Sequence, residues 1–289
     1  MNNRASSRRR NRIDQAFSRL KRVGESAFIP FITAGDPDIA VTKALVKELV
    51  SQGADIIELG LPFSDPLADG PTIQAASQRA LRNNINITHL FELVSGLRSE
   101  GIDVPLVLMG YYNSILQYGL EKFAADAASI GFDGTIVPDL PLEESVEWVR
   151  ASRRHNLSTI FLVAPTTPPE RARRIAKASR GFIYYVSVTG ITGARNDLPS
   201  ELLSGIKTVK NLTSLPVAVG FGVSRPEQVA MLSAVADGII VGSAIVRLVE
   251  ENLIKDGGTY RPGRELINKV GDFVERLKAE TRKKTRSVA

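Results

Sequence analysis

The sequence contains no cysteine among its 289 residues and only two histidines, His89 and His155. The first absence excludes disulfide bonds and thiolate metal sites, and the scarcity of histidine leaves no ligand set for a His-rich zinc centre. No apolar run approaches the length of a membrane span, and the arginine-rich N-terminus lacks the apolar segment of a secretory signal. We therefore expect a cytoplasmic protein without a metal site.

Positive charge is concentrated at the two ends of the chain. Residues 1–22 carry a net charge of +7 and residues 281–289 carry +4, so the total of +6 leaves residues 23–280 at about −5. No aromatic residues are interleaved with the arginines and no recognition-helix pattern follows them, so we expect no nucleic-acid partner. We expect a basic flexible arm at 1–10, a folded body at 11–280 and a basic tail after it.

Eight short apolar runs recur along the chain, at 27–33, 54–59, 105–110, 134–138, 159–164, 181–187, 216–220 and 237–241. Each precedes a segment with helical spacing, at 39–52, 87–100, 116–130, 142–154, 168–179, 200–210, 225–234 and 244–254. Continuous apolar runs such as GIIV are typical of parallel strands buried on both faces. Eight strand-helix repeats predict a single-domain α/β fold, the (β/α)8 TIM barrel, and favour it over an open doubly wound sheet.

Two features depart from the regular repeat. Ile13, Phe17 and Leu20 have helical spacing before the first strand, which predicts an extra N-terminal helix across the bottom of the barrel. The βα loops after strands two and six are longer than the others. They fall on the face where barrel enzymes carry their chemistry, so we predict that these enlarged loops act as lids.

The stretch 54–74, ADIIELGLPFSDPLADGPTIQ, supplies carboxylates of two kinds. Glu58 ends an apolar strand, where burial would raise its pKa, whereas Asp69 lies in a Pro- and Gly-rich loop that could close over a ligand. This division suits acid/base chemistry. The alternatives are a structural, paired Glu58, a turn-forming Asp69, or a Mg²⁺ site made by Asp65 with Asp69.

Small residues follow the last three strands and suggest an anion site. They are Gly190, Gly193, Gly220, Gly222, Gly242 and Ser243, the last at the start of a helix. Glycine lets backbone N–H groups approach an anion, and a helix N-terminus adds partial positive charge. Because no Walker lysine is present, the pattern indicates the monophosphate of a small substrate. The alternative is a set of tight turns.

The segments FIPFITAGDPD, at 28–38, and IELGLPFSDPLADGPTIQ, at 57–74, resemble the signature of the tryptophan synthase alpha subunit family. Similar segments continue to about residue 243. The resemblance implies the lyase component that cleaves indole-3-glycerol phosphate to indole and glyceraldehyde 3-phosphate by a retro-aldol reaction. It also implies an alpha2-beta2 complex in which indole passes to the beta subunit for L-tryptophan synthesis. Pyridoxal phosphate would belong to beta, and this chain would need no cofactor.

The same resemblance assigns roles to residues. Glu58 becomes the principal acid/base group, and Asp69 the group that binds the indole N–H. The phosphate would be held at Gly193, Gly222, Gly242 and Ser243. The indole pocket would be lined by Phe31, Met109, Ile136, Tyr184, Thr192, Phe221 and Ile240. Ordinary core packing is the alternative for the two isoleucines. Because only one of two successive strand residues faces the barrel interior, we expect it to be Tyr184 and not Tyr185.

Two other functions remain open at this stage. One is a free-standing indole-3-glycerol-phosphate lyase, which activity without a beta subunit would reveal. The other is a non-catalytic, phosphate-binding regulatory barrel. The presence of both Glu58 and Asp69 argues against the second, because a degenerate site should have lost one of them.

Overall fold

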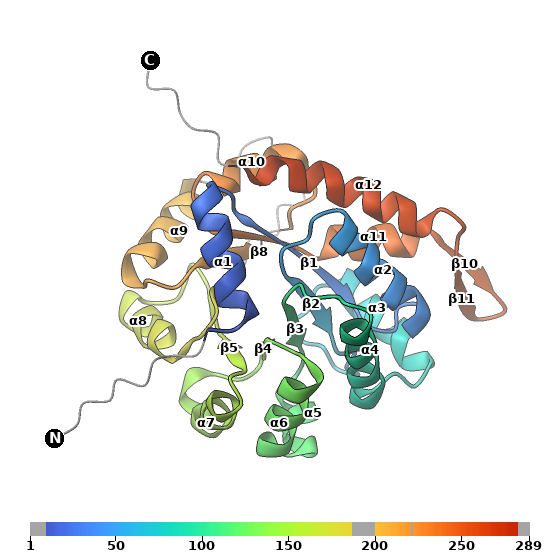
Figure 1. Ribbon diagram of the computed structural model, residues 1–289, viewed down its shortest axis with the longest axis horizontal. Helices are drawn as coiled ribbons and strands as arrows, with labels where there is room; N and C mark the ends of the chain where they lie inside the picture. The colour runs from blue at the N-terminus through green and yellow to red at the C-terminus, as the bar shows by residue number, and fades with distance from the viewer. Residues whose placement is uncertain (1–9, 187–199, 221, 283–289) are drawn as a thin grey trace.

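The computed structural model describes residues 10–186, 200–220 and 222–282. Within these ranges nine strand segments form one parallel sheet, in the order β5-β4-β3-β2-β1-β9-β8-β7-β6, that curls into a barrel (Figure 1). The segments are β1 (Ala27–Thr33), β2 (Ile57–Gly60), β3 (Leu106–Met109), β4 (Gly134–Ile136), β5 (Ser158–Ile160), β6 (Leu162–Val163), β7 (Ile183–Val186), β8 (Val217–Gly220) and β9 (Gly238–Val241).

The two ends of this order belong to one stretch of chain. β5 and β6 are separated only by Phe161, β5 pairs with β4, and β6 pairs with β7. The predicted fifth strand at 159–164 therefore closes the sheet into a barrel, because its first half pairs with β4 and its second half pairs with β7. If β5 and β6 are counted as one strand, the described part of the chain has eight barrel strands, and the predicted (β/α)8 barrel is confirmed.

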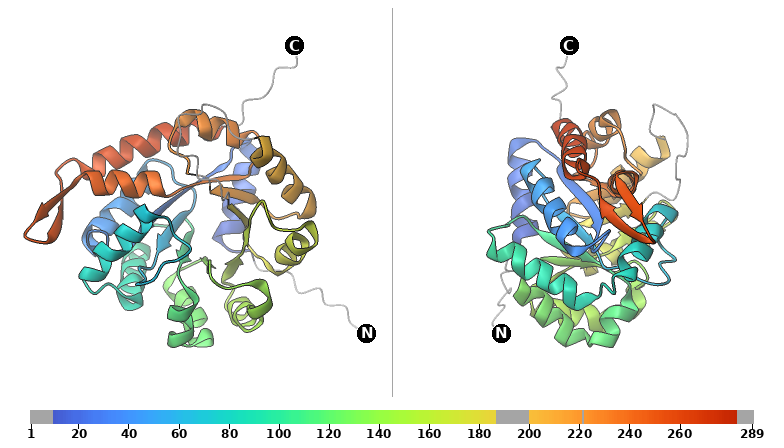
Figure 2. Two further views of the ribbon diagram at one scale, coloured as in Figure 1. Left: turned by 180° about the vertical axis from the view of Figure 1, so that it is seen from behind. Right: turned by 90° about the vertical axis from the view of Figure 1, so that its right-hand side faces the viewer.

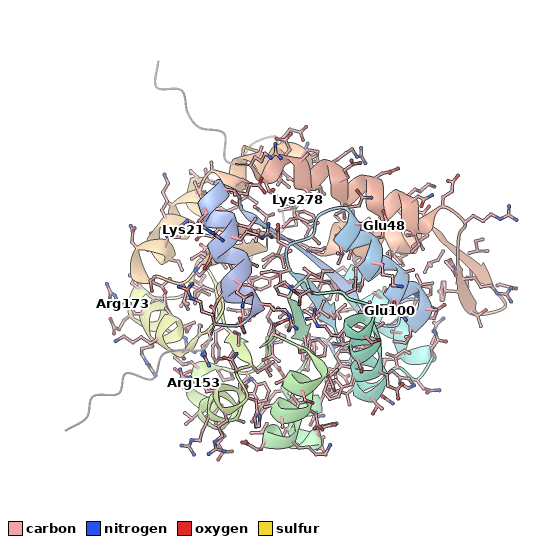
Figure 3. All side chains as sticks on the ribbon, in the orientation of Figure 1. Lys21, Glu48, Glu100, Arg153, Arg173 and Lys278 are labelled. Atoms are coloured by element: carbon pink, nitrogen blue, oxygen red, sulfur yellow. The ribbon has the colours of Figure 1, made fainter. Side chains whose placement is uncertain are left out.

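Helices surround the strands on the outside (Figures 1 and 2). They are α2 (Ile39–Ser51), α3 (Pro71–Arg82), α4 (Ile87–Ser99), α5 (Tyr112–Tyr118), α6 (Leu120–Ile130), α7 (Val146–Arg154), α8 (Pro169–Ala178), α9 (Ser200–Leu212), α10 (Pro226–Ser233), α11 (Ser243–Glu251) and α12 (Leu266–Lys278), with 3₁₀ turns at Leu142–Glu144 and Ala279–Thr281. Their apolar sides bury Phe123 and Trp148 against the sheet, and charged side chains such as Arg153 and Arg173 lie on the exposed side (Figure 3). In the described ranges no helix is long and apolar enough to cross a membrane.

The N-terminal helix α1 (Arg12–Val23) closes the amino end of the barrel, as the sequence predicts. Asn11 caps it by accepting from two backbone N–H groups, and Gly24, at φ +69°, ends it. Its apolar residues join the interior side chains of the strands in one inner cluster (Ile13, Ala16, Phe17, Leu20, Ala27, Ile29, Ile56, Val107, Ile136, Ile160, Phe182, Ala218 and Ile240). The base of the barrel is therefore packed, and the opposite, carboxyl face is the one where barrels of this kind carry their sites.

Three aspartates hold strands together at the same base. Asp55, Asp133 and Asp237 each precede a strand, and each Oδ2 accepts the backbone N–H of the adjacent strand at 3.0 Å. Each also pairs with a cation. Lys278 of α12, for example, places Nζ 2.6 Å from Asp55, which ties the last described helix to the first two strands (Figure 3). Asp55 and Asp133 are buried and Asp237 is partly exposed. The buried carboxylates are stable because the hydrogen bonds and the cation replace lost water.

Several elements differ from the expectation. The helix predicted at 116–130 is two helices, α5 and α6, that meet at Gly119 with φ +93°. The helix predicted at 244–254 ends at Glu251, and the chain then forms the hairpin of β10 (Leu253–Asp256) and β11 (Thr259–Pro262). Gly257 and Gly258 both have positive φ in its two-residue turn. The hairpin projects from the barrel in Figures 1 and 2.

Candidate active site

Glu58 lies inside the barrel near the carboxyl end of β2, in register with Phe31 of β1 and Val107 of β3. Its side chain is 0% exposed, and neither carboxylate oxygen has a hydrogen-bond partner among the described residues. Burial raises the pKa of Glu58 to about 8. The group is therefore mostly neutral at pH 7, and it can both give and take a proton near that pH.

Asp69 is held in place by the segment that carries it and by the end of β3. Gln74 donates from Nε2 to the Asp69 carbonyl oxygen at 2.8 Å. The Tyr111 hydroxyl donates to Asp69 Oδ2 at 3.1 Å and accepts the backbone N–H of Ala68 at 3.0 Å. Its ring stacks on Phe63 at 4.8 Å between centroids. Burial raises the pKa of Asp69, and the hydrogen bond from Tyr111 opposes that shift.

Tyr111 is a site residue that the sequence analysis missed. The available signal was its position, directly after the predicted barrel strand at 105–110, where catalytic groups of this fold collect. An aromatic residue there is equally typical of core packing, so the pattern alone did not separate the two roles.

An apolar cavity adjoins Asp69. Two of the predicted ring contacts, Phe31 and Met109, line it together with Ile73 and Tyr111. Gly60 also lines it, and a Cβ at this position would lie 2.6 Å from the Phe31 ring. Glycine at position 60 therefore lets an aromatic ring lie across the end of β2. The cavity has mostly apolar walls and one carboxylate, and at about 10 Å³ its walls must move apart to admit a flat ring with a single N–H donor.

Tyr184 faces the barrel interior and packs against the inner cluster, whereas Tyr185 belongs to the outer core between sheet and helices. Burial raises the pKa of Tyr184 well above its ordinary value, and the charges of Glu58 and Asp69 add to the effect. Tyr184 thus lies near both carboxylates. A Cβ on Gly220 would meet the Tyr184 hydroxyl at 2.5 Å, so this glycine makes room for the phenol.

The remaining predicted ring contacts fall into two groups. Ile136 and Ile240 are 0% and 3% exposed and belong to the inner cluster, so both pack the barrel whether or not they touch a ligand. Thr192 and Phe221 lie outside the described residues, as does Gly193 of the predicted phosphate set.

Two of the predicted phosphate residues, Gly242 and Ser243, form the start of α11. Gly242 is its N-cap and Ser243 its first residue, and no side chain caps the helix within the described part of the chain. A Cβ on Gly242 would lie 3.5 Å from Phe31, so this helix start lies against one of the residues that line the apolar cavity. Gly222 is exposed and has φ +58°, a conformation that favours glycine. A helix N-terminus without a side-chain cap is a suitable anion site.

No group of three or more metal-binding side chains occurs in the ranges that the structure describes. Asp65 is exposed and its Oδ2 accepts the Ser64 hydroxyl at 2.6 Å, while Asp69 is engaged by Tyr111. The arrangement gives the Mg²⁺ alternative no support.

The fold and these groups define the class of the protein: a (β/α)8-barrel enzyme with a buried carboxyl group at the end of a strand. A family model described as tryptophan synthase alpha chain matches residues 17–280. The chain belongs to the tryptophan synthase alpha chain family, the lyase component of tryptophan synthase. The resemblance seen in the sequence is thereby confirmed.

Relatives match along most of the chain. The tryptophan synthase alpha chain of Geobacter sulfurreducens is 50% identical over 240 residues, 83% of this chain and 90% of that protein. That of Geotalea uraniireducens is 47% identical over 269 residues, 93% and 97% of the two chains. Among solved structures, Mycobacterium tuberculosis tryptophan synthase has a TM-score of 0.84 at 36% identity, covering 95% of this chain and 99% of that one. Subunit alpha from Legionella pneumophila has a TM-score of 0.84 at 37% identity, covering 94% and 99%.

Proposed function

We propose that this chain cleaves indole-3-glycerol phosphate to indole and glyceraldehyde 3-phosphate, with Glu58 as the proton shuttle and Asp69 as the partner of the indole N–H. The observation that carries the proposal is Glu58 itself. A wholly buried carboxyl group with a pKa near 8 is costly for stability, and it is suited to exchanging protons at neutral pH.

The reaction breaks the bond between indole C3 and the first side-chain carbon. Neutral Glu58 gives its proton to C3, which places positive charge on the ring at N1. Asp69, as an anion, stabilises that charge through the N1–H. The C3–carbon bond then breaks while the side-chain hydroxyl loses its proton and becomes the aldehyde. The Glu58 carboxylate takes that proton, so the enzyme returns to its starting protonation state.

In this proposal the start of α11 binds the phosphate end of the substrate, and the apolar cavity binds the indole end. The phosphate would accept hydrogen bonds from the backbone at Gly242 and Ser243, with Gly193 and Gly222 completing the site. The indole ring would lie against Phe31 and Met109. Binding the two ends at fixed places orients C3 toward Glu58, and orientation of this kind accounts for a large part of enzymatic rate acceleration.

We propose that the indole released by this chain is the substrate of a second reaction, which a partner subunit catalyses. In this proposal the chain joins a beta subunit in an alpha2-beta2 complex, indole passes to beta, and beta uses pyridoxal phosphate to make L-tryptophan. The alpha chain itself works with side chains alone, in the cytoplasm. Family membership and the similarity to a solved tryptophan synthase support this assignment.

The test is indole release from indole-3-glycerol phosphate by the purified chain, with and without a beta subunit. Glu58→Gln should lower turnover by about 10² to 10⁴-fold, because the proton shuttle is lost. Asp69→Asn should lower it as well, and Asp65→Asn, in the same loop, is the matched control. Cleavage that beta stimulates supports the proposal. Fast cleavage without beta would indicate a free-standing lyase, and none under any condition would indicate a binding barrel.

A further inference from the structure

A partly buried ion cluster outside the reacting groups joins three segments of the chain. Arg79 of α3 is 5% exposed and holds Asp36, in the segment after β1, with two parallel hydrogen bonds of 2.7 and 2.8 Å. Asp36 is itself 3% exposed. The third Arg79 nitrogen, Nη1, lies 2.8 Å from Glu250 in the last turn of α11. A planar, bidentate contact of this kind fixes direction as well as distance.

The same two helices also meet through apolar side chains. Ala76 of α3, Val246 of α11 and Phe31 of β1 form a small buried cluster. Arg79 follows Ala76 by about one turn, and Glu250 follows Val246 by about one turn. α3 and α11 are therefore joined twice along their shared side, first by packing and then by the ion pair.

Each helix begins at one end of the proposed substrate site. α3 starts directly after Gly70, and Gln74 in its first turns holds the carbonyl of Asp69. α11 starts at Ser243, where the phosphate would bind. Because a helix transmits a shift at one end to the other, the ion pair between α3 and α11 relates the position of Asp69 to that of the phosphate site.

The projecting hairpin of β10 and β11 also contacts this cluster. Tyr260 of β11 places its ring 5.9 Å from the Arg79 guanidinium and 5.7 Å from that of Arg82. The aromatic face favours cations, so the ring stabilises the two guanidinium groups. The contact between Arg79 and Asp36 is buried and is weakened little by solvent, whereas the contact with Glu250 is partly exposed.

We propose that Arg79 is a positioning residue that couples the ring-binding end of the site to the phosphate-binding end through α3 and α11. The proposal rests on the proposed function, because it takes the substrate's two ends from it. A ligand at either end would order one helix, and the Arg79 link would order the other helix with it, so that the second ligand binds more tightly.

Glu250→Gln tests the link with little risk to folding. Glu250 is 45% exposed, and the change removes its charge while the contact between Arg79 and Asp36 stays. The matched control is Glu251→Gln, an exposed neighbour on the same helix. The probes are indole for the ring end and glycerol 3-phosphate for the phosphate end, each titrated calorimetrically alone and in the presence of the other.

In the native chain and in Glu251→Gln, each probe should raise the affinity for the other by about fivefold or more, and by the same factor in both directions. In Glu250→Gln the factor should fall toward one, while the chain still binds each probe alone. An unchanged factor in Glu250→Gln, or native binding of both probes without coupling, would overturn the role of Arg79 and leave the proposed function standing. A native chain that binds neither probe would overturn both.

Discussion

Replacing Glu58 by Gln should make the protein more stable in mildly alkaline solution as well as less active. The side chain is 0% exposed, and its pKa is raised from 4.5 to about 8 by burial. Gln has nearly the same shape and carries no charge at any of these pH values. The substitution therefore removes the cost of ionising a buried group and alters the packing very little.

The sign of the effect follows from proton binding. Between pH 4.5 and about pH 8 the folded chain holds a proton on Glu58 that the unfolded chain has released. The native protein is then most stable, with respect to this group, below pH 4.5, and it loses that stability as pH rises through about 8. At 1.36 kcal/mol per pKa unit, the loss between pH 5 and pH 8 is about 3 to 4 kcal/mol.

The assay is equilibrium urea unfolding of the native chain and Glu58→Gln at pH 5 and pH 8. The difference in unfolding free energy between the two proteins should grow in favour of the variant by about 3 to 4 kcal/mol from the lower to the higher pH. Glu92→Gln, at an exposed site on α4, is the control and should follow the native chain. A difference that does not change with pH would refute the raised pKa and, with it, the argument that Glu58 starts the reaction protonated.

Three further substitutions test the supports of the site and of the barrel. Tyr111→Phe removes the hydroxyl that donates to Asp69 and keeps the stacked ring, so kcat/KM should fall about tenfold with little change in unfolding; an unchanged kcat/KM would show that Asp69 does not depend on this bond. Gly220→Ala places a methyl group where the Tyr184 hydroxyl lies, and it should destabilise the chain by about 1 to 3 kcal/mol in urea unfolding; a neutral result would mean that the phenol moves freely. Lys278→Met leaves a buried aspartate with fewer partners at the base and should lower Tm by about 3 to 8 °C without changing KM; a changed KM would show that the base and the site are not independent.

The repeated strands and helices were predictable because the pattern of apolar residues in each one shows which of its faces is buried. Apolar runs such as 238–241 are continuous where a strand is covered on both faces, and the spacing of Ile13, Phe17 and Leu20 reveals the side of α1 that enters the barrel. Glu58 was visible for the same reason. Glu58 is a charged residue within an apolar run, so the run predicts both that the residue lies on a strand and that its carboxyl group is buried.

Other features depend on contacts between distant segments, which periodicity does not report. The break at Phe161 comes from two halves of one strand that follow different neighbours, and the sequence is apolar on both sides of it, from 160 to 164. Arg79 looks like an ordinary surface cation of a helix until Asp36 and Glu250 are brought to it. The hairpin was missed although Gly257 and Gly258 gave a local turn signal, because the preceding residues continue the helical pattern of α11.

The most direct test of the central claim is the pH dependence of kcat/KM for indole release, measured for the native chain and Glu58→Gln with the same beta subunit. If Glu58 must be protonated at the start, the native value should fall as pH rises through about 8, the pKa of the free enzyme. Glu58→Gln should be about 10² to 10⁴-fold slower and should lack that fall. A Glu58→Gln enzyme that keeps its rate and the same decline near pH 8 would contradict the account, because another group would then be moving the proton.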